Sequence, residues 1–210
     1  MQETDASVNI VDDDPAVRDS LKWLMESVNL PVKSFSTGME FLDSDASKEP
    51  GCVILDIRMP GMSGIDVFEE LQSRESAIPV IFLTGHGDVH LAVRAMKSGA
   101  FDFVEKPFND QVLLDLIQKA IRHDAAYLSL RVELDDIKER LTHLTTRERE
   151  VLDGVVGGRA NRIIAEDLGL SEKTIEFHRA KMMEKMRAET LAELIRLITT
   201  LEKWDTDHLA

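Results

Sequence analysis

The sequence has few of the features that tie a protein to a membrane or to an oxidising compartment. Cys52 is the only cysteine among 210 residues, so no disulfide can form within the chain. No run of about 18 apolar residues is present, and no membrane-spanning helix is expected. The N-terminal residues are acidic and lack an apolar core, so we expect no export signal and a cytoplasmic location.

The chain also has fewer basic residues than acidic ones, 25 Lys and Arg against 39 Asp and Glu. The net charge is −14, and it is unevenly distributed: −11 over residues 1–124, −1 over 125–143 and −2 over 144–210. This acidity argues against a nonspecific nucleic-acid binder, because the field of the whole protein would repel phosphates. It leaves room for a local basic surface.

The length favours two domains, and the first has an α/β pattern. Short apolar runs rich in β-branched residues predict buried strands at 8–11, 31–35, 52–56, 78–84 and 101–106. Helical patterns follow them at 15–28, 37–44, 64–75, 88–98 and from 109 onward. This alternation predicts a parallel sheet covered on both faces over 1–124, with its functional crevice at the carboxyl ends of the strands.

A heptad pattern continues from this domain through a linker at 125–143. The seam positions, spaced by alternate steps of four and three, are Leu116, Ala120, His123, Tyr127, Leu130, Leu134, Ile137, Leu141 and Leu144, of which Ala120 and His123 are weak members. No Gly or Pro interrupts them, which predicts one continuous helix. Two interpretations stay open: the helix packs on its own domains, or it forms a coiled coil that joins two copies of the chain.

Residues 144–210 have helical patterns only, at about 147–156, 160–168, 171–186 and 190–203. Thr145 and Glu148 have the spacing of a capping box, Gly169 ends a helix, and Ser171 is placed to cap the next one. The sequence therefore predicts an all-α second domain.

Charged and polar side chains follow the predicted strands of the first domain. Asp12 and Asp13 end the first strand, Asp56 the third, Thr84 the fourth and Lys106 the fifth. Since the carboxyl ends of parallel strands meet at one edge, we expect these side chains to lie together. An Asp run before Pro15 is also typical of an ordinary helix start, so the aspartates alone decide little.

Clustered carboxylates repel each other unless a cation lies among them. Mg²⁺ fits this set, because it prefers oxygen ligands and bridges to phosphate, and the carbonyl of Arg58 offers a further ligand. Asp56, at the end of the central strand, is the predicted nucleophile toward a phosphoryl group. Lys106 would neutralise that group and Thr84 would donate a hydrogen bond to it.

The segments VDDDPAVRDSL, LDIRMPGMSGID, TGHGDVHLAVRAMKSGA and FDFVEKPF resemble the receiver domains of response regulators, in particular the FixJ group, over residues 6–122. The resemblance implies a flavodoxin-like sheet with strand order 2-1-3-4-5. It implies that Asp56 is the phosphoacceptor, that Asp13 binds Mg²⁺ or Mn²⁺ directly with Asp12 beside it, and that Lys106 contacts the phosphoryl group.

The same resemblance assigns Thr84 and Phe103 as a switch pair and implies a cis peptide between Lys106 and Pro107. The resemblance also implies that a sensor histidine kinase is the partner and phosphodonor. Such receivers catalyse only their own phosphorylation and dephosphorylation, so no other enzyme activity is predicted.

The predicted helix 171–186 has two contrasting faces. Its inward stripe consists of Ile175, His178, Met182 and Met186. Its outward stripe consists of Lys173, Glu176, Phe177, Ala180, Lys181 and Glu184. An exposed Phe beside a small Ala and two lysines suits a helix in a DNA major groove, and residues 173–187 carry a net charge of +3. A solvated amphipathic helix is the alternative.

The segments LTTREREVL and NRIIAEDLGLSEKTIEFHRAKMMEKM resemble the LuxR/NarL/FixJ type of helix-turn-helix domain, over about 142–203. The resemblance places Glu176, Phe177 and Ala180 at base edges, and Lys173, Thr174, Arg179 and Lys181 at phosphates. Asn161-Arg162 departs from the commoner Asn-Lys pair, which puts phosphate contacts there in doubt.

Together these patterns predict a response regulator transcription factor, in which phosphorylation changes homodimerisation and promotes DNA binding. Activation through RNA polymerase is the expected outcome. Two other classes of protein remain open. An aspartyl-phosphate hydrolase of the haloacid-dehalogenase type needs a second Asp two residues after the nucleophile, where this chain has Arg58. A receiver acting only through protein partners would have a degenerate DNA-binding domain.

Overall fold

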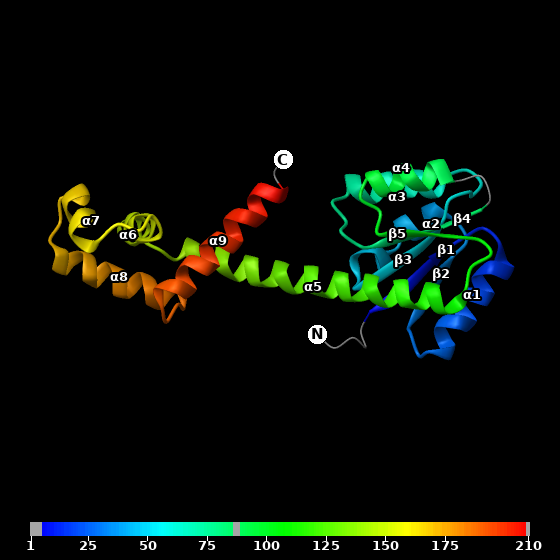
Figure 1. Ribbon diagram of the computed structural model, residues 1–210, viewed down its shortest axis with the longest axis horizontal. Helices are drawn as coiled ribbons and strands as arrows, with labels where there is room; N and C mark the ends of the chain where they lie inside the picture. Colours follow the sequence, from blue (N-terminus) through cyan, green and yellow to red (C-terminus); the bar gives the residue numbers. More distant parts are fainter. Residues whose placement is uncertain (1–5, 86–88, 209–210) are drawn as a thin grey trace. The chain divides into compact units, whose positions relative to one another are not determined.

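The computed structural model describes residues 6–85 and 89–208. The chain divides into two units, Met1–Leu128 and Ser129–Ala210 (Figure 1). Each unit has its own hydrophobic core. In the two described ranges, none of the helices combines the length and the apolar character that crossing a bilayer requires.

Unit 1 contains a five-stranded parallel sheet. Its strands are β1 (Ser7–Val11), β2 (Val32–Phe35), β3 (Gly51–Asp56), β4 (Val80–Thr84) and β5 (Asp102–Glu105). They pair in the order β2-β1-β3-β4-β5, which confirms the predicted α/β fold and strand order. Every residue of β1, β3 and β4 is buried, because these apolar runs lie in the middle of a sheet that is covered on both faces.

Helices cover both faces of this sheet. They are α1 (Pro15–Ser27), α2 (Gly38–Asp43), the 3₁₀ turn η2 (Asp45–Lys48), α3 (Gly64–Ser73), α4 (Val89–Lys97) and α5 (Asp110–Thr142). One core cluster joins the sheet to α2, α3 and α4, and another joins it to α1 and α5. The predicted helix 88–98 includes residue 88, which lies outside the described residues. The η2 turn was not predicted.

Buried β3 holds the only thiol of the chain. The side chain of Cys52 has no solvent exposure, and burial raises its pKa to about 12. A thiol in this environment is not a nucleophile at neutral pH. The two tryptophans differ from each other: Trp23 on α1 is 79% exposed, whereas Trp204 is half-buried in the core of unit 2.

Helix α5 is continuous over 33 residues, as the heptad pattern predicted. The seam residues contact the cores of the chain itself. Ala120 is buried in the core of unit 1, and Leu134, Ile137 and Leu144 are buried in that of unit 2. These contacts favour packing on the chain's own domains, and a coiled coil between two copies stays an untested prediction.

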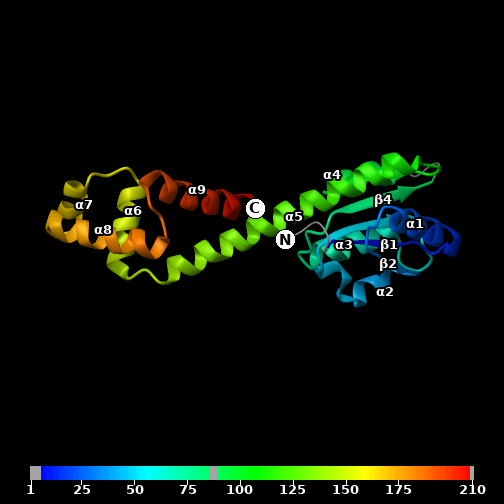
Figure 2. The ribbon, with the colours of Figure 1, turned by 90° about the horizontal axis from the view of Figure 1, so that it is seen from below.

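Unit 2 continues with α6 (Thr146–Val156), α7 (Asn161–Leu168), α8 (Glu172–Met186) and α9 (Leu191–His208). Helices α6, α7 and α8 lie together in both views (Figure 1, Figure 2). Helix α9 extends beyond the predicted end at residue 203, because Trp204 still packs against the core.

Local capping fixes the ends of these helices where the sequence predicted. Thr145 and Glu148 form a complete capping box at α6, and Ser171 caps α8. Gly169 ends α7 in the left-handed conformation, at φ 65°. Glu148 is also buried, and it accepts a hydrogen bond of 2.6 Å from Lys185 Nζ on α8. The capping residue of α6 therefore also joins two helices.

Glu148→Gln is expected to lower the free energy of unfolding of unit 2 by about 1–3 kcal/mol at pH 7, because a buried charge-assisted hydrogen bond is lost. Burial disfavours the carboxylate, but hydrogen bonds from Lys185 and Thr145 outweigh it and lower the pKa of Glu148 below its usual value. This stabilisation is present above the unfolded-state pKa and is lost as the pH falls through the folded-state pKa, so the difference from wild type should shrink below about pH 4.5.

Denaturant unfolding in a Trp23→Phe background measures this difference, with Trp204 fluorescence as the probe of unit 2. Glu150→Gln is the matched control, since Glu150 pairs with Arg147 at the surface and should cost little. A loss that is the same at every pH would show that the charge of Glu148 is not the cause.

Candidate functional site

Three charged side chains meet at the carboxyl edge of the sheet. Lys106 Nζ lies 2.9 Å from Asp12 Oδ2 and 2.6 Å from Asp56 Oδ1. Asp12 follows β1, Asp56 ends β3, and Lys106 follows β5, so the lysine reaches past β4. This confirms that the strand ends predicted from the sequence lie together.

Each of the two carboxylates is also held by its own stretch of chain. Asp12 Oδ1 accepts a hydrogen bond of 2.9 Å from the amide of Asp14, and Asp56 Oδ2 accepts one of 2.7 Å from the amide of Arg58. One oxygen of each carboxylate thus bonds locally and the other bonds Lys106. Asp14 in turn caps α1 by accepting from the amide of Ala16, as Asp14-Pro15 predicted.

Burial sets the electrostatics of this cluster. Asp12 is 1% exposed and Asp56 is 8% exposed. Burial raises the pKa of Asp56 above its usual value, and the bond and charge of Lys106 offset this only in part. Burial would lower the pKa of Lys106, but its hydrogen bonds to Asp56 and Asp12 outweigh that effect and raise it. The ammonium therefore stays charged and keeps two buried carboxylates together.

Thr84 and Phe103 lie on the neighbouring strands β4 and β5. Thr84 is 1% exposed and its hydroxyl donates to the carbonyl of Gly85 at 3.1 Å. Phe103 is half-buried against the core cluster of α2, α3 and α4. The amide of Lys106 donates to the carbonyl of Thr84 at 2.7 Å, and the Lys106–Pro107 peptide is cis, as expected. The switch role of the pair stays a prediction.

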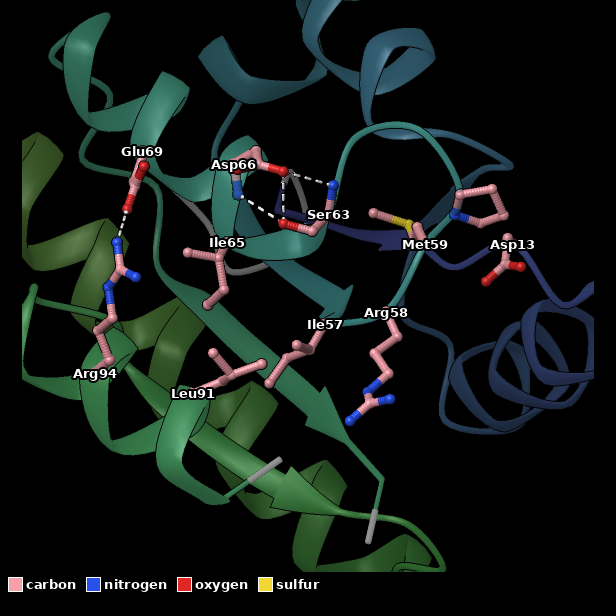
Figure 3. A pocket seen from close by; sticks show the side chains of 11 residues that line it. Asp13, Ile57, Arg58, Met59, Ser63, Ile65, Asp66, Glu69, Leu91 and Arg94 are labelled. Carbon is pink, nitrogen blue, oxygen red and sulfur yellow. Dashed lines mark hydrogen bonds and ion pairs between the residues drawn. The ribbon is translucent and has the colours of Figure 1, made fainter. Parts of the chain in front are cut away.

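Beside the charged cluster lies a pocket of about 630 Å³ (Figure 3). Its lining residues are Asp13, Ile57, Arg58, Met59, Pro60, Ser63, Ile65, Asp66, Glu69, Leu91 and Arg94. Of the charged residues in this lining, the sequence analysis predicted a role only for Asp13 and Arg58. Arg94 on α4 pairs with Glu69 on α3 at 2.8 Å, a contact between helices that no local sequence pattern signals.

Gly64, at the start of α3, shows how tightly the loop after β3 is packed. A Cβ atom at this position would lie 2.1 Å from the carbonyl oxygen of Asp56. The amide of Gly64 donates to the carbonyl of Ile57 at 3.0 Å. Only glycine allows α3 to approach the strand so closely, and this approach fixes the backbone of Asp56.

The donors at this edge are of the kind that magnesium prefers: the carboxylates of Asp12, Asp13 and Asp56, and the carbonyl of Arg58. Asp13 is exposed and lines the pocket, whereas Asp12 and Asp56 are paired with Lys106. Over residues 6–85 and 89–208, no three His, Cys, Asp or Glu side chains are grouped closely enough to enclose a metal ion. The residues fit a magnesium ion in chemical type, and the ligand set stays a prediction.

In unit 2, α8 has the two faces that the sequence predicted. Ile175, Met182 and Met186 are fully buried, and His178 is half-buried, as expected for a structural residue. On the opposite face the side chains are exposed: Lys173, Glu176, Phe177, Ala180, Lys181 and Glu184. Phe177 is 60% exposed, among the exposed charged and small side chains of this face.

Several polar residues of α8 have local partners. Arg179 Nη1 donates to Asn161 Oδ1 on α7 at 3.0 Å, and Lys181 pairs with Glu184 at 2.8 Å. The hydroxyls of Thr174 and Ser171 are 2.8 Å apart. Arg179 thus links α7 to α8, a role that the sequence did not indicate.

Comparisons with known proteins find a family match in each unit. Residues 8–118 match the family described as response regulator receiver domain, and residues 142–198 match bacterial regulatory proteins, luxR family. The transcriptional regulatory protein FixJ of Bradyrhizobium diazoefficiens is 42% identical over 92% of this chain and 95% of its own length. FixJ of Azorhizobium caulinodans is 43% identical over 90% of each chain.

Solved structures show the same architecture. The response regulator StyR superposes with a TM-score of 0.83 at 39% identity, over 93% of this chain and 98% of its own. Full-length FixJ from B. japonicum superposes with a TM-score of 0.59 at 41% identity, over 94% of this chain and 98% of its own.

Lys106→Met is expected to raise the pKa of Asp56 further, since it removes the ammonium that offsets burial and leaves the carboxylate buried beside Asp12. Carbon-13 NMR titration of the Asp56 carboxyl measures the change. Lys48→Met is the control, because Lys48 pairs with Asp45 at an exposed position of η2. An Asp56 pKa that stays the same or falls in Lys106→Met would contradict this account of the site.

Proposed function

The chain belongs to the response regulators that join a receiver domain to a LuxR-type DNA-binding domain, and on this basis we propose that Asp56 is its phosphoacceptor. A response regulator of this type is a transcription regulator that pairs with a histidine kinase and binds DNA. The observation that carries the assignment is the placement of Asp56: it ends the central strand, contacts Lys106 at 2.6 Å and lies beside an open pocket.

In the proposed reaction a carboxylate oxygen of Asp56 attacks the phosphorus of a phospho-histidine on the partner kinase. The P–N bond breaks, the imidazole leaves with the electron pair, and an acyl phosphate forms on Asp56. Water later hydrolyses this acyl phosphate and regenerates the carboxylate. The chain acts only on itself, and its Arg58, in place of a second Asp, gives no support to a hydrolase.

Lys106 is placed to pair with negatively charged oxygens both before and after phosphoryl transfer. Its ammonium balances the carboxylates of Asp12 and Asp56 before transfer, and it is close enough to pair with a phosphoryl oxygen afterwards. Magnesium or manganese, held by Asp12, Asp13, Asp56 and the Arg58 carbonyl, would supply further positive charge for the phosphoryl oxygens. The pocket beside Asp13 and Arg58 leaves this edge open to a donor.

Thr84 and Phe103 would then change their positions in response to phosphorylation of Asp56. A phosphoryl oxygen is a stronger acceptor than the Gly85 carbonyl to which the Thr84 hydroxyl now donates. As Thr84 turns toward it, the half-buried Phe103 turns inward, and the surface of α4 and β5 becomes a dimerisation face. Two DNA-binding domains are thereby brought to paired half-sites, with RNA polymerase recruitment and activation as the result.

Helix α8 is the proposed recognition helix. Its exposed face presents Glu176, Phe177 and Ala180 to base edges in the major groove. Phosphate contacts, which fix register without reading sequence, would come from Lys173, Thr174, Arg179 and Lys181. We place the protein in the cytoplasm, where kinase and DNA are both accessible.

Asp56→Asn is expected to abolish phosphoryl transfer from a cognate phospho-kinase, because an amide nitrogen is no nucleophile toward phosphorus at neutral pH. Incorporation of radiolabelled phosphate into the full chain measures the transfer. Treatment with base should remove the label, because base hydrolyses an acyl phosphate. Asp43→Asn, at the exposed end of α2, is the control and should label like wild type. Undiminished labelling of Asp56→Asn would refute the assignment.

Phe177→Ala and Glu176→Ala are expected to change which DNA sequences are selected, since these side chains are placed at base edges. Lys173→Ala should weaken all sites alike and reduce the salt dependence of binding. Selection from a random DNA library followed by anisotropy titrations separates the two effects. Val132→Ala, at an exposed apolar position of α5, is the control. An unchanged preference in both α8 variants would remove α8 as the reader of sequence.

A further inference from the structure

The C-terminal end of α8 is bound by residues of α5. Arg140 Nη1 donates to the carbonyl of Met186, the last residue of α8, at 3.0 Å. Arg140 Nη2 pairs with Asp136 one turn earlier on α5. The other oxygen of Asp136 lies 3.6 Å from Arg187 Nη1, at the C-cap of α8. Two arginines and one carboxylate thus join the two helices.

Arg140 meets a need of α8 that the helix cannot meet by itself. The last carbonyls of a helix have no partner within it, and the negative end of its dipole attracts cations. Met186 is fully buried, so water is a poor substitute at its carbonyl. Arg187 ends the helix in the left-handed conformation without being glycine, at φ 53°. Arg140 supplies both a donor and a positive charge at this point.

Burial makes this contact costly to keep. The side chain of Arg140 is only 18% exposed. Its Nε is one of three buried side-chain atoms in the described part of the chain that have no hydrogen-bond partner. An unpaired buried donor costs about 1–3 kcal/mol, and this cost offsets part of what the other bonds of Arg140 contribute. Arg140 therefore contributes less to stability than its bonds to Met186 and Asp136 alone would indicate.

A third cation, Lys185, adds to the same contact between helices. Lys185, in the last turn of α8, donates to Glu148 Oε2 at 2.6 Å and to the carbonyl of His143 at 3.1 Å. His143 directly follows α5, which ends at Thr142. The end of α5 and the end of α8 are therefore joined within unit 2 by three contacts: Arg140 with Met186, Asp136 with Arg187, and Lys185 with His143.

We propose that Arg140 is a positioning residue for DNA recognition, which transmits changes along α5 to the recognition helix α8. Helix α5 starts at Asp110 in unit 1 and ends at Thr142 in unit 2, so it contains residues of both. The inference rests on the proposed function, in which α8 reads DNA and phosphorylation of unit 1 increases its affinity. It adds the contact through which the two are coupled.

The test compares DNA affinity of the full-length chain with and without beryllofluoride and Mg²⁺, a stable mimic of the phosphoryl group. The readout is the gain, the ratio of the two Kd values on a duplex selected by the wild type. Arg140→Met keeps the aliphatic stem and removes the guanidinium, and should reduce the gain by about threefold or more. Arg140→Lys keeps the charge and one donor, and should restore part of it.

Arg149→Met is the matched control. Arg149 also donates to a backbone carbonyl, that of Leu141 at 2.6 Å, but it is exposed and its bond does not involve α8. Its variant should retain the wild-type gain. Asp136→Asn leaves Arg140 free to bond Met186 but removes the carboxylate that holds it, and should lower the gain less than Arg140→Met does.

The outcomes separate the inference from the function on which it rests. A wild-type chain without any gain would overturn both. A wild-type gain that Arg140→Met retains would overturn only the role of Arg140. Two outcomes would show a merely structural role and overturn positioning. In one, Arg140→Met and Asp136→Asn weaken DNA affinity equally with and without beryllofluoride. In the other, the folded fraction, followed by circular dichroism, falls in step with the gain.

Discussion

The ammonium of Lys106 between two buried carboxylates is the interaction on which the first unit depends. Asp12 and Asp56 lie on adjacent strands, and without a cation their charges would repel each other at the edge of the sheet. The strand order brings the loop after β5 back to them, and the ammonium satisfies one oxygen of each. The site therefore holds a charge balance, which the proposed phosphorylation of Asp56 would alter.

In the second unit, the residues proposed to contact DNA lie along α8 and do not meet at one point. The protein carries a net charge of −14, so no long-range attraction draws the whole chain to DNA. Several polar residues of α8 already have partners, such as Arg179 with Asn161 and Lys181 with Glu184. In the proposed phosphate contacts these side chains would change partners, and recognition would then depend on how the exposed face with Phe177 is presented.

The sequence predicted the sheet and the meeting of the strand ends well, because fully buried strands leave short continuous apolar runs and parallel strands end on one edge; the strand order came from the resemblance to receiver domains. It predicted the caps of α6 and α8, since Thr145, Glu148 and Ser171 act within a few residues of themselves. It missed η2, and it could not decide the role of the α5 seam, because a heptad pattern is the same whether the partner is the chain itself or a second copy. The Arg140–Met186 bond joins residues 46 positions apart, which no local pattern can signal.

The buried position of Cys52 has a practical consequence. The native surface in the described part of the chain offers no reactive thiol, because the single cysteine lies inside β3 with its pKa at about 12. One cysteine introduced at an exposed position is therefore the sole target of a maleimide or a spin label while the protein stays folded. A pair of such labels, one in each unit, makes the distance between the units directly measurable in solution, before and after activation.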